Sequence, residues 1–257
     1  MSREFFYTDA SAIVGASATL TGDEANHITR VLRKEPGDQI WITDGADNAY
    51  EAVIQSAGKQ QVQCEIISSH HHANESLLDV TLAVGVVKNP SRMDWLIEKC
   101  TELGIRKFIP IRSERSVHYT AKVDRWSALA LAAMKQSMRC WLPQITDVTD
   151  FASLLAEKTP YDLKVVLHEA TDSAKHLQHV AAQKPEARTV LLLIGPEGGF
   201  TEEEVALAEH AGFLTASLGA RRLRTETAAV VASSWMTAQE MTAVRIFHRG
   251  HRDRFSL

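Results

Sequence analysis

The segment VLLLIGPEGGFTEEEV, which spans residues 190–205, indicates how the surrounding domain folds. Its first five residues are apolar and mostly branched, a pattern that is typical of a strand buried on both faces of a parallel sheet. The glycines of GPEGG permit a left-handed backbone and the close approach of a ligand. Thr201 and Glu204 then form a capping-box pattern that predicts the start of a helix. This order predicts a ligand-binding crevice at the carboxyl end of an α/β sheet.

A second segment repeats the pattern of a strand, a loop and a helix. Residues 214–218 predict a short strand, residues 219–226 form a loop with three arginines, and a long apolar helix follows. Arg222 and Arg224, beside Glu226, could bind an anionic ligand or stabilise developing negative charge. Arginines in a loop can also be solvated surface, and the glycine loop can be an ordinary turn between a strand and a helix.

The composition limits the class of protein. The chain has 257 residues, of which 45% are hydrophobic, so it can form one large domain or two modest ones. The net charge of −4 does not indicate a nucleic-acid partner, but basic residues cluster at 106–139 and 245–254. The three widely spaced cysteines include no CxxC pair, which predicts a reduced, cytoplasmic protein without a zinc site. We expect neither a signal peptide nor a membrane span, since no run of about 18 apolar residues occurs.

The N-terminal part is predicted to be a small, barrel-like β domain with one helix. Strand patterns at 39–43, 50–55 and 62–68 are separated by turn signals, and a capping box at 21–24 predicts a helix through Arg33. Three consecutive histidines begin the polar segment 70–76. We predict a solvated linker there rather than a metal site, because adjacent side chains of an extended segment point in alternating directions.

The remaining sequence alternates between strands and helices. Strand patterns at 78–84, 108–111, 163–167, 190–194 and 214–218 enclose helical patterns such as 91–103 and 124–137. This alternation predicts an α/β domain with a parallel sheet. We therefore predict two domains, 1–72 and 73–257. The sequence lacks the usual motifs of nucleotide-binding oxidoreductases, P-loop enzymes, zinc proteases and serine hydrolases, so those activities have no support.

Several basic residues could contact phosphate groups. Arg30, Arg33 and Lys34 would share one face of the predicted N-terminal helix, where they either contact phosphate or are simply solvated. The same choice applies further along the chain to Arg112, Arg115, Lys122, Arg125, Lys135 and Arg139, and Gln136 flanks a predicted helix end together with Arg139. His168 follows a predicted strand, so it either faces the crevice or has a structural role.

Motifs along nearly the whole chain resemble one known family. LIGPEGGF at 193–200, followed by LG at 218–219 and LRTETA at 223–228, resembles the SPOUT class of ribosomal RNA methyltransferases. Within this class, the RsmE-type family of 16S rRNA uridine-N3 methyltransferases is the most similar. The motifs that carry this resemblance are NHI and RVLR at 26–33, EKCTELG at 98–104, SERS at 113–116, KQS at 135–137 with Arg139, and LP at 142–143. KNP at 88–90 and Met138 depart from this pattern, in which Lys-Gly and Gly are common, and both lie outside the two crevice loops.

The resemblance implies a fold and an activity that residue patterns alone do not. The C-terminal domain would be a SPOUT trefoil-knot α/β domain, although the general rule against knots would exclude it. The N-terminal domain would be a PUA-like β-barrel that binds RNA. The protein would be a homodimer that uses S-adenosyl-L-methionine to methylate N3 of a specific uridine in 16S rRNA of the small ribosomal subunit.

The resemblance also suggests roles for individual residues. Arg224 would stabilise charge on the uridine ring, with Arg222 as the second choice. Glu226 is a candidate proton acceptor, Glu197 and water are alternatives, and Glu226 could instead complement the helix dipole. The predicted cofactor-binding residues are His168, Leu193, Gly195, Pro196, Glu197, Gly198, Gly199, Leu218, Gly219, Leu223, Thr225 and Thr227. The predicted RNA-binding residues are Arg30, Arg33, Lys34, Arg115, Lys135, Gln136 and Arg139. No metal is expected.

Two alternatives to this function stay open. One is a SPOUT methyltransferase that acts on tRNA or on another rRNA position, and residue chemistry does not separate it from the first function. The other is a non-catalytic rRNA-binding assembly factor. The glycine loop and the LRTETA segment favour catalysis, because a protein that only binds RNA does not need a cofactor crevice.

Overall fold

A computed structural model describes residues 5–116, 122–169 and 175–249, with side chains described as far as residue 237. The side chains of the basic tail at 245–254 therefore lie outside the described residues. The chain divides into two compact units. The first comprises Met1–Glu75 and Ala130–Leu142, and the second comprises Ser76–Leu129 and Pro143–Leu257. The predicted boundary at residues 72 and 73 stays a prediction, but residues 130–142 were not expected in the first unit.

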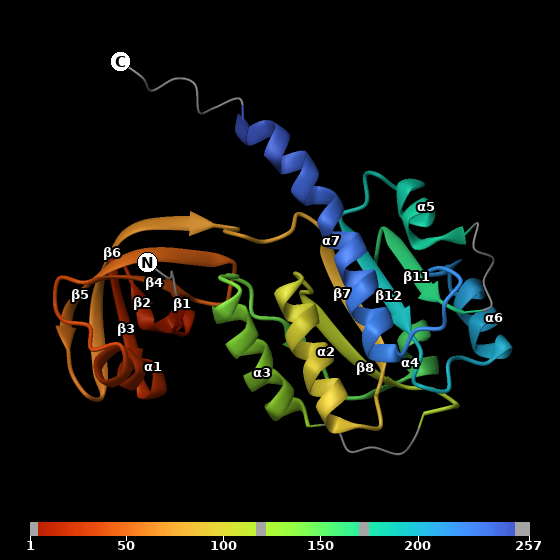
Figure 1. The fold of residues 1–257 in the computed structure, drawn as a ribbon, viewed down its shortest axis with the longest axis horizontal. Helices are drawn as coiled ribbons and strands as arrows, with labels where there is room; N and C mark the ends of the chain where they lie inside the picture. The colour runs from red at the N-terminus through yellow and green to blue at the C-terminus, as the bar shows by residue number, and fades with distance from the viewer. Residues whose placement is uncertain (1–4, 117–121, 170–174, 250–257) are drawn as a thin grey trace. The chain divides into compact units, whose positions relative to one another are not determined.

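The first unit is built on a curved sheet in the order β1-β4-β5-β6-β3-β2 (Figure 1). Strand β1 runs parallel to β4, and the other pairs are antiparallel. Register shifts between β5 and β6 at Glu51/Ala52 and Ile54/Ser56 introduce bulges, which increase the local twist of a sheet. Phe6, Leu20 and Ile42 lie in the apolar core beneath it. The strands are β1 (Phe5–Tyr7), β2 (Ile13–Val14), β3 (Ser17–Thr21), β4 (Gln39–Thr43), β5 (Asn48–Ala57) and β6 (Gln61–His71), with a 3₁₀ turn at Ala10–Ala12.

The N-terminal helix differs from the prediction. Helix α1 (Gly22–Asn26) continues into a π-helical turn, η2 (His27–Val31), and Thr21 makes no side-chain capping bond. Arg33 has a left-handed backbone with φ 52°. Because a π turn changes the angular spacing of side chains and the helix ends before Arg33, the prediction that Arg30, Arg33 and Lys34 share one helix face is wrong. Arg30 and Arg33 are nevertheless exposed.

The triple-histidine segment is not the solvated linker that we predicted. His70 and His71 belong to β6, and His70 lies 3.1 Å from the Glu51 carboxylate. The Nδ1 of His72 lies 2.9 Å from the carboxylate of Asp47. Within the described residues, no cluster of His, Cys, Asp or Glu has the arrangement of a metal site.

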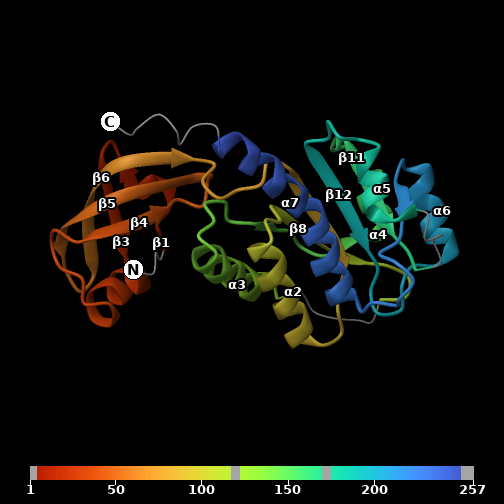
Figure 2. The ribbon, with the colours of Figure 1, turned by 45° about the horizontal axis from the view of Figure 1, so that its top comes forward.

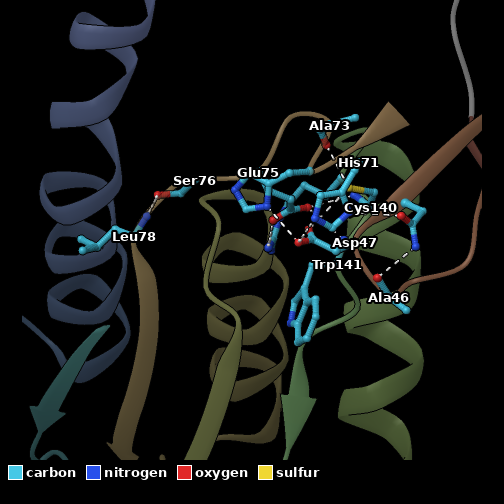
Figure 3. Close-up of polar contacts among 12 residues, drawn as sticks. Ala46, Asp47, His71, Ala73, Glu75, Ser76, Leu78, Cys140 and Trp141 are labelled. Atoms are coloured by element: carbon cyan, nitrogen blue, oxygen red, sulfur yellow. Dashed lines mark hydrogen bonds and ion pairs between the residues drawn. The ribbon is translucent and has the colours of Figure 1, made fainter. Parts of the chain in front are cut away.

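A buried ion pair joins residues 130–142 to the rest of the first unit. The side chains of Arg139 and Glu75 are 3% and 0% exposed, and the Nε of Arg139 donates to both Glu75 oxygens at 3.2 and 3.1 Å. Oxygen Oε1 of Glu75 also accepts the backbone N–H groups of Cys140 and Trp141, each at 2.9 Å (Figure 3). Glu75 therefore fixes the turn that follows helix α3 (Val123–Gln136).

The second unit contains a parallel sheet in the order β10-β8-β7-β12-β11-β13, with β9 also paired to β8. Central strand β12 lies between β7 and β11, and all three are parallel. This arrangement explains why residues 190–194 are uniformly apolar, since both faces of a central parallel strand are covered. The strands are β7 (Asp79–Gly85), β8 (Lys107–Arg112), β9 (Gln144–Ile145), β10 (Thr149–Asp150), β11 (Leu163–Leu167), β12 (Thr189–Ile194) and β13 (Leu214–Ala216).

Helices cover both faces of this sheet (Figures 1 and 2). Helices α2 (Pro90–Glu102) and α7 (Thr225–Arg249) pack against each other on one face, while α4 (Phe151–Ala156) and α6 (Glu202–His210) share an apolar core with the opposite face. Helix α5 (Leu177–Ala182) also contacts α7. None of the described helices combines the length and apolar character of a membrane span. The predicted fold class, a parallel α/β domain preceded by a small β domain, is confirmed.

Candidate functional site

A cavity of about 470 Å³ lies in the second unit, at the carboxyl ends of β11 and β12. Both loops singled out by the sequence contribute to its walls, together with His168 and Arg115. Because β11 is paired in parallel to both β12 and β13, their carboxyl ends meet at one edge of the sheet. The lining residues are Arg115, Leu167, His168, Glu169, Ile194, Gly195, Pro196, Glu197, Gly198, Gly199, Phe200, Glu202, Leu218, Gly219, Arg221, Arg222, Leu223, Arg224, Thr225 and Ala228.

The glycine loop has the local structure that its sequence predicts. Gly199 has φ +69°, and its N–H donates to the carbonyl oxygen of Pro196 at 2.8 Å. The Thr201 hydroxyl accepts the N–H of Glu204 at 3.1 Å, and the Glu204 carboxylate accepts the N–H of Thr201 at 3.0 Å, so the capping box is complete. This left-handed residue and this cap direct the chain from β12 into α6 around the cavity.

Three neighbouring segments hold the loop in place. The carboxylate of Glu197 accepts the backbone N–H of Lys88 at 3.0 Å, so Glu197 braces the loop. The Nη1 of Arg115 donates to the carbonyl oxygen of Gly198 at 3.1 Å, and the Thr225 hydroxyl donates to that of Gly195 at 3.0 Å. Arg115, predicted to contact phosphate, therefore lies beside the cavity and supports the glycine loop.

Gly85, which the sequence analysis did not single out, allows the closest approach. It ends β7, and a Cβ placed on it would lie 2.3 Å from the backbone nitrogen of Pro196. Only glycine therefore permits β7 and the glycine loop to touch in this way. The sequence did contain a signal for this close approach, because a glycine directly follows the apolar run at 78–84.

The two arginines predicted to be catalytic have different surroundings, although both belong to the arginine loop at residues 219–226. Arg222 forms an ion pair with Glu169, with 3.0 Å between Nε and Oε2, and both side chains are largely exposed. Arg224 also lines the cavity and is exposed, and within the described part of the chain its side chain has no polar partner. Arg224 is thus the better placed of the two to contact a bound ligand.

Glu226 lies outside the cavity lining, next to Thr225. Its side chain is only 9% exposed, and Oε1 lies 3.6 Å from the Nε of Arg92 in the first turn of α2. The other carboxylate oxygen, Oε2, is buried and has no hydrogen-bond partner among the described residues. Arg92 could not be identified from the sequence, because no local pattern brings residue 92 to residue 226.

The remaining predicted residues are distributed as follows. Of the predicted cofactor residues, Leu193 and Thr227 do not line the cavity, and Leu193 packs in the apolar core. Of the predicted RNA contacts, Lys135 is ion-paired to Glu24. Arg139 is buried against Glu75, so it is not available to contact phosphate and is withdrawn from that set.

The chain is similar to known families and proteins. A family described as an RNA methyltransferase domain matches residues 74–237, and an RNA methyltransferase PUA domain matches residues 20–67. The ribosomal RNA small subunit methyltransferase E of Bacillus subtilis (strain 168) is 34% identical, over 86% of this chain and 90% of that protein. The protein of the same name from Synechocystis is 31% identical, over 88% of this chain and 74% of that protein.

Solved structures agree with the sequence comparisons. The crystal structure of a ribosomal RNA small subunit methyltransferase E from Neisseria gonorrhoeae, bound to S-adenosyl methionine, superposes with a TM-score of 0.81 and 30% identity. The superposition covers 93% of this chain and 98% of the Neisseria gonorrhoeae chain. A Legionella pneumophila protein solved with the bound cofactor SAM gives a TM-score of 0.77 and 31% identity, covering 93% of this chain and 98% of that one. This chain belongs to the family of ribosomal RNA small subunit methyltransferase E.

Proposed function

We propose that the protein binds S-adenosyl-L-methionine in the cavity and methylates N3 of a uridine in 16S rRNA of the small ribosomal subunit. The observation that carries this proposal is the single cavity formed by both predicted loops, which lies at the strand ends where α/β sheets bind ligands. The Neisseria gonorrhoeae relative, whose name refers to small-subunit rRNA, is bound to S-adenosyl methionine.

The residues of the cavity fit such a cofactor. A volume of about 470 Å³ is typical of a small-molecule site, and the backbone of Gly195–Gly199 leaves room for close contacts. Arg115 provides positive charge for a carboxylate, and Glu202 can accept hydrogen bonds. The glycine loop and residues 218–223 would surround the ligand. When bound, the sulfonium supplies an electrophilic methyl group.

The chain's own residues would then orient the uridine and stabilise its charge. N3 of uridine takes part in Watson–Crick pairing, so the base must be single-stranded or flipped out to reach the cavity. Alignment of N3 with the methyl group lowers the barrier by several kcal/mol. Loss of the N3 proton leaves negative charge on the ring oxygens, and Arg224 is suited to stabilise it because its guanidinium is exposed at the cavity.

The first unit is proposed to bind RNA. The PUA-domain match at residues 20–67 includes the exposed Arg30 and Arg33. We further propose that the protein is a cytoplasmic homodimer, as the family resemblance implies. Sedimentation equilibrium would test the dimer, and a monomer at micromolar concentration that retains full activity would contradict it.

The decisive experiment is transfer of labelled methyl groups from S-adenosyl-L-methionine to unmodified small ribosomal subunits. Nucleoside mass spectrometry should then find N3-methyluridine in the 16S rRNA. Transfer to tRNA or to another rRNA nucleoside would replace the proposed substrate. No transfer to subunits, naked rRNA or tRNA, with RNA binding intact, would favour the assembly-factor alternative.

A further inference from the structure

Arg92 and Glu226 form a charged pair beside the cavity that the proposed cofactor contacts do not use. Glu226 follows Thr225, which lines the cavity and is bonded to Gly195. Arg92 belongs to the segment after β7, which is fixed to the glycine loop by the bond between Lys88 and Glu197. One contact therefore attaches the segment that bears Arg92 to the cavity wall, and the other attaches the residue next to Glu226 to the same wall.

The pair has a hydrogen-bond acceptor on Glu226 and hydrogen-bond donors on Arg92 that are not used. Within the described residues, Oε2 of Glu226 has no partner although its side chain is nine-tenths buried. Leaving a buried carboxylate oxygen unpaired costs free energy, so a donor supplied by a ligand would stabilise this oxygen. The guanidinium of Arg92 has five N–H donors, and the side chain is 38% exposed. The one polar contact described for this side chain is the 3.6 Å approach of Nε to Glu226.

An unpaired acceptor beside unpaired donors matches the edge of uracil. On that edge, the N3–H donor lies next to carbonyl oxygens, which accept hydrogen bonds. Cytosine presents the reverse pattern, because its N3 is an acceptor and its neighbouring amino group is a donor. A carboxylate next to a guanidinium thus favours uracil and leaves unpaired groups against cytosine.

We propose that Glu226 and Arg92 together recognise the target uracil, an inference that rests on the proposed function. Glu226 accepts the N3–H, and Arg92 donates to an adjacent ring oxygen. In the reaction, the N3–H bond breaks and its proton moves to Oε2 of Glu226. N3 forms a bond to the methyl carbon as the carbon–sulfur bond breaks, and that bonding pair remains on sulfur. Arg92 stabilises the charge on the ring oxygen, and Arg224 contacts the ring from the cavity side.

The test compares Glu226→Gln, Arg92→Ala and Arg92→Lys with the wild type in single-turnover methylation of small subunits. At neutral pH, Glu226→Gln should lower the rate about 100-fold, since it removes a general base. The deficit should shrink as the pH rises, because hydroxide then removes the N3 proton. Arg92→Ala should lower the rate on the order of 100-fold, as expected for a lost charge-stabilising donor, and Arg92→Lys should restore part of it. Affinity for S-adenosyl-L-methionine should not change.

A binding measurement provides a readout that does not depend on turnover. Subunits are reconstituted from transcripts that carry uridine or cytidine at the methylated position. The wild type should bind the uridine form about 10-fold more tightly or better, and both Glu226→Gln and Arg92→Ala should lose this preference. Lys99→Ala is the matched control, because Lys99 is a cation of the same helix whose ion pairs, among the described residues, are with Glu98 and Glu102.

The outcomes separate this inference from the proposed function. If the wild type transfers no methyl group to uridine N3, both fail. If the wild type is active but both variants keep their preference for uridine, the recognition pair is wrong while the proposed function stands. A Glu226→Gln variant with the wild-type pH profile and weaker binding of S-adenosyl-L-methionine would show a structural role and overturn the proposal.

Discussion

The hydroxyl of Thr225 donates a hydrogen bond of 3.0 Å to the backbone carbonyl oxygen of Gly195. This bond joins the first residue of α7 to the first glycine after β12, across 30 residues of sequence. Both residues line the cavity, and Thr225 is only 5% exposed. The bond therefore fixes the separation between the two loops that form the site.

Replacing Thr225 should test this connection. Thr225→Val keeps the shape of the side chain but leaves the carbonyl oxygen of Gly195 without its donor, at a cost of about 1–3 kcal/mol of unfolding free energy. We expect a lower melting temperature and weaker binding of S-adenosyl-L-methionine in calorimetry. Thr225→Ser retains the hydroxyl and is the control. Equal affinities for Thr225→Val and the wild type would show that the loops hold their spacing without this bond.

Gly85 should tolerate no side chain. In Gly85→Ala the new Cβ would lie 2.3 Å from the nitrogen of Pro196, and because that atom belongs to the backbone, the glycine loop itself must move. Overpacking of this kind typically costs about 1–3 kcal/mol, and here it would also displace the cavity wall. Calorimetry should show a large loss of cofactor affinity. Ser91→Ala, at an exposed position in the first turn of α2, is the control, and wild-type affinity in Gly85→Ala would disprove the close approach.

Local patterns predicted the elements around the cavity well. The apolar run became β12, and Thr201 and Glu204 form the capping box that their spacing indicated. Both features depend on residues within a few positions of each other, so the sequence carries them directly. The capping-box pattern at 21–24, by contrast, gave a wrong prediction. Thr21 forms no side-chain cap, and the helix continues as a π turn.

Pairings between distant residues could not be predicted from the sequence. Arg92 reaches Glu226, and Arg139 reaches Glu75, only because the chain folds back on itself. Arg139 had the pattern of a phosphate-contacting cation, and its burial reverses that interpretation. General rules of chain topology also argue against a knotted chain, so the knot was expected only from the family resemblance. Met138, at a position where the family resemblance leads us to expect glycine, has a left-handed φ of 57°, which glycine adopts freely.

The Glu75–Arg139 pair should be a major determinant of stability in the first unit. Glu75→Leu would remove the carboxylate that pairs with the buried guanidinium of Arg139 and accepts two backbone N–H groups. Breaking a buried pair from one side costs about 3–5 kcal/mol, which urea unfolding can measure. The double variant Glu75→Leu/Arg139→Met should lose less than the sum of the single losses, because no buried charge remains. Additive losses would argue against a direct interaction.

Alkaline pH should destabilise the protein through its buried thiols. Burial raises the pKa of Cys100 from 9.0 to about 12 and that of Cys64 to about 11. The unfolded chain therefore loses these protons at lower pH than the folded chain does. The resulting stability is fully present below pH 9 and is lost as the pH rises from 9 towards 12. Urea unfolding at increasing pH should show this decline, and Cys100→Ala should weaken it. An equal decline in Cys100→Ala would rule out Cys100 as a cause.

Arg33 offers the clearest test of RNA binding by the first unit. Its side chain is exposed, and its left-handed backbone, φ 52°, is a conformation that glycine adopts without strain. Arg33→Gly should therefore remove the charge without destabilising the fold. If Arg33 contacts phosphate, the slope of log affinity against log salt concentration for 16S rRNA should decrease by about 1. Lys99→Ala, which removes a cation paired within its own helix, should leave the slope unchanged. An unchanged slope in Arg33→Gly would place the RNA-binding surface elsewhere.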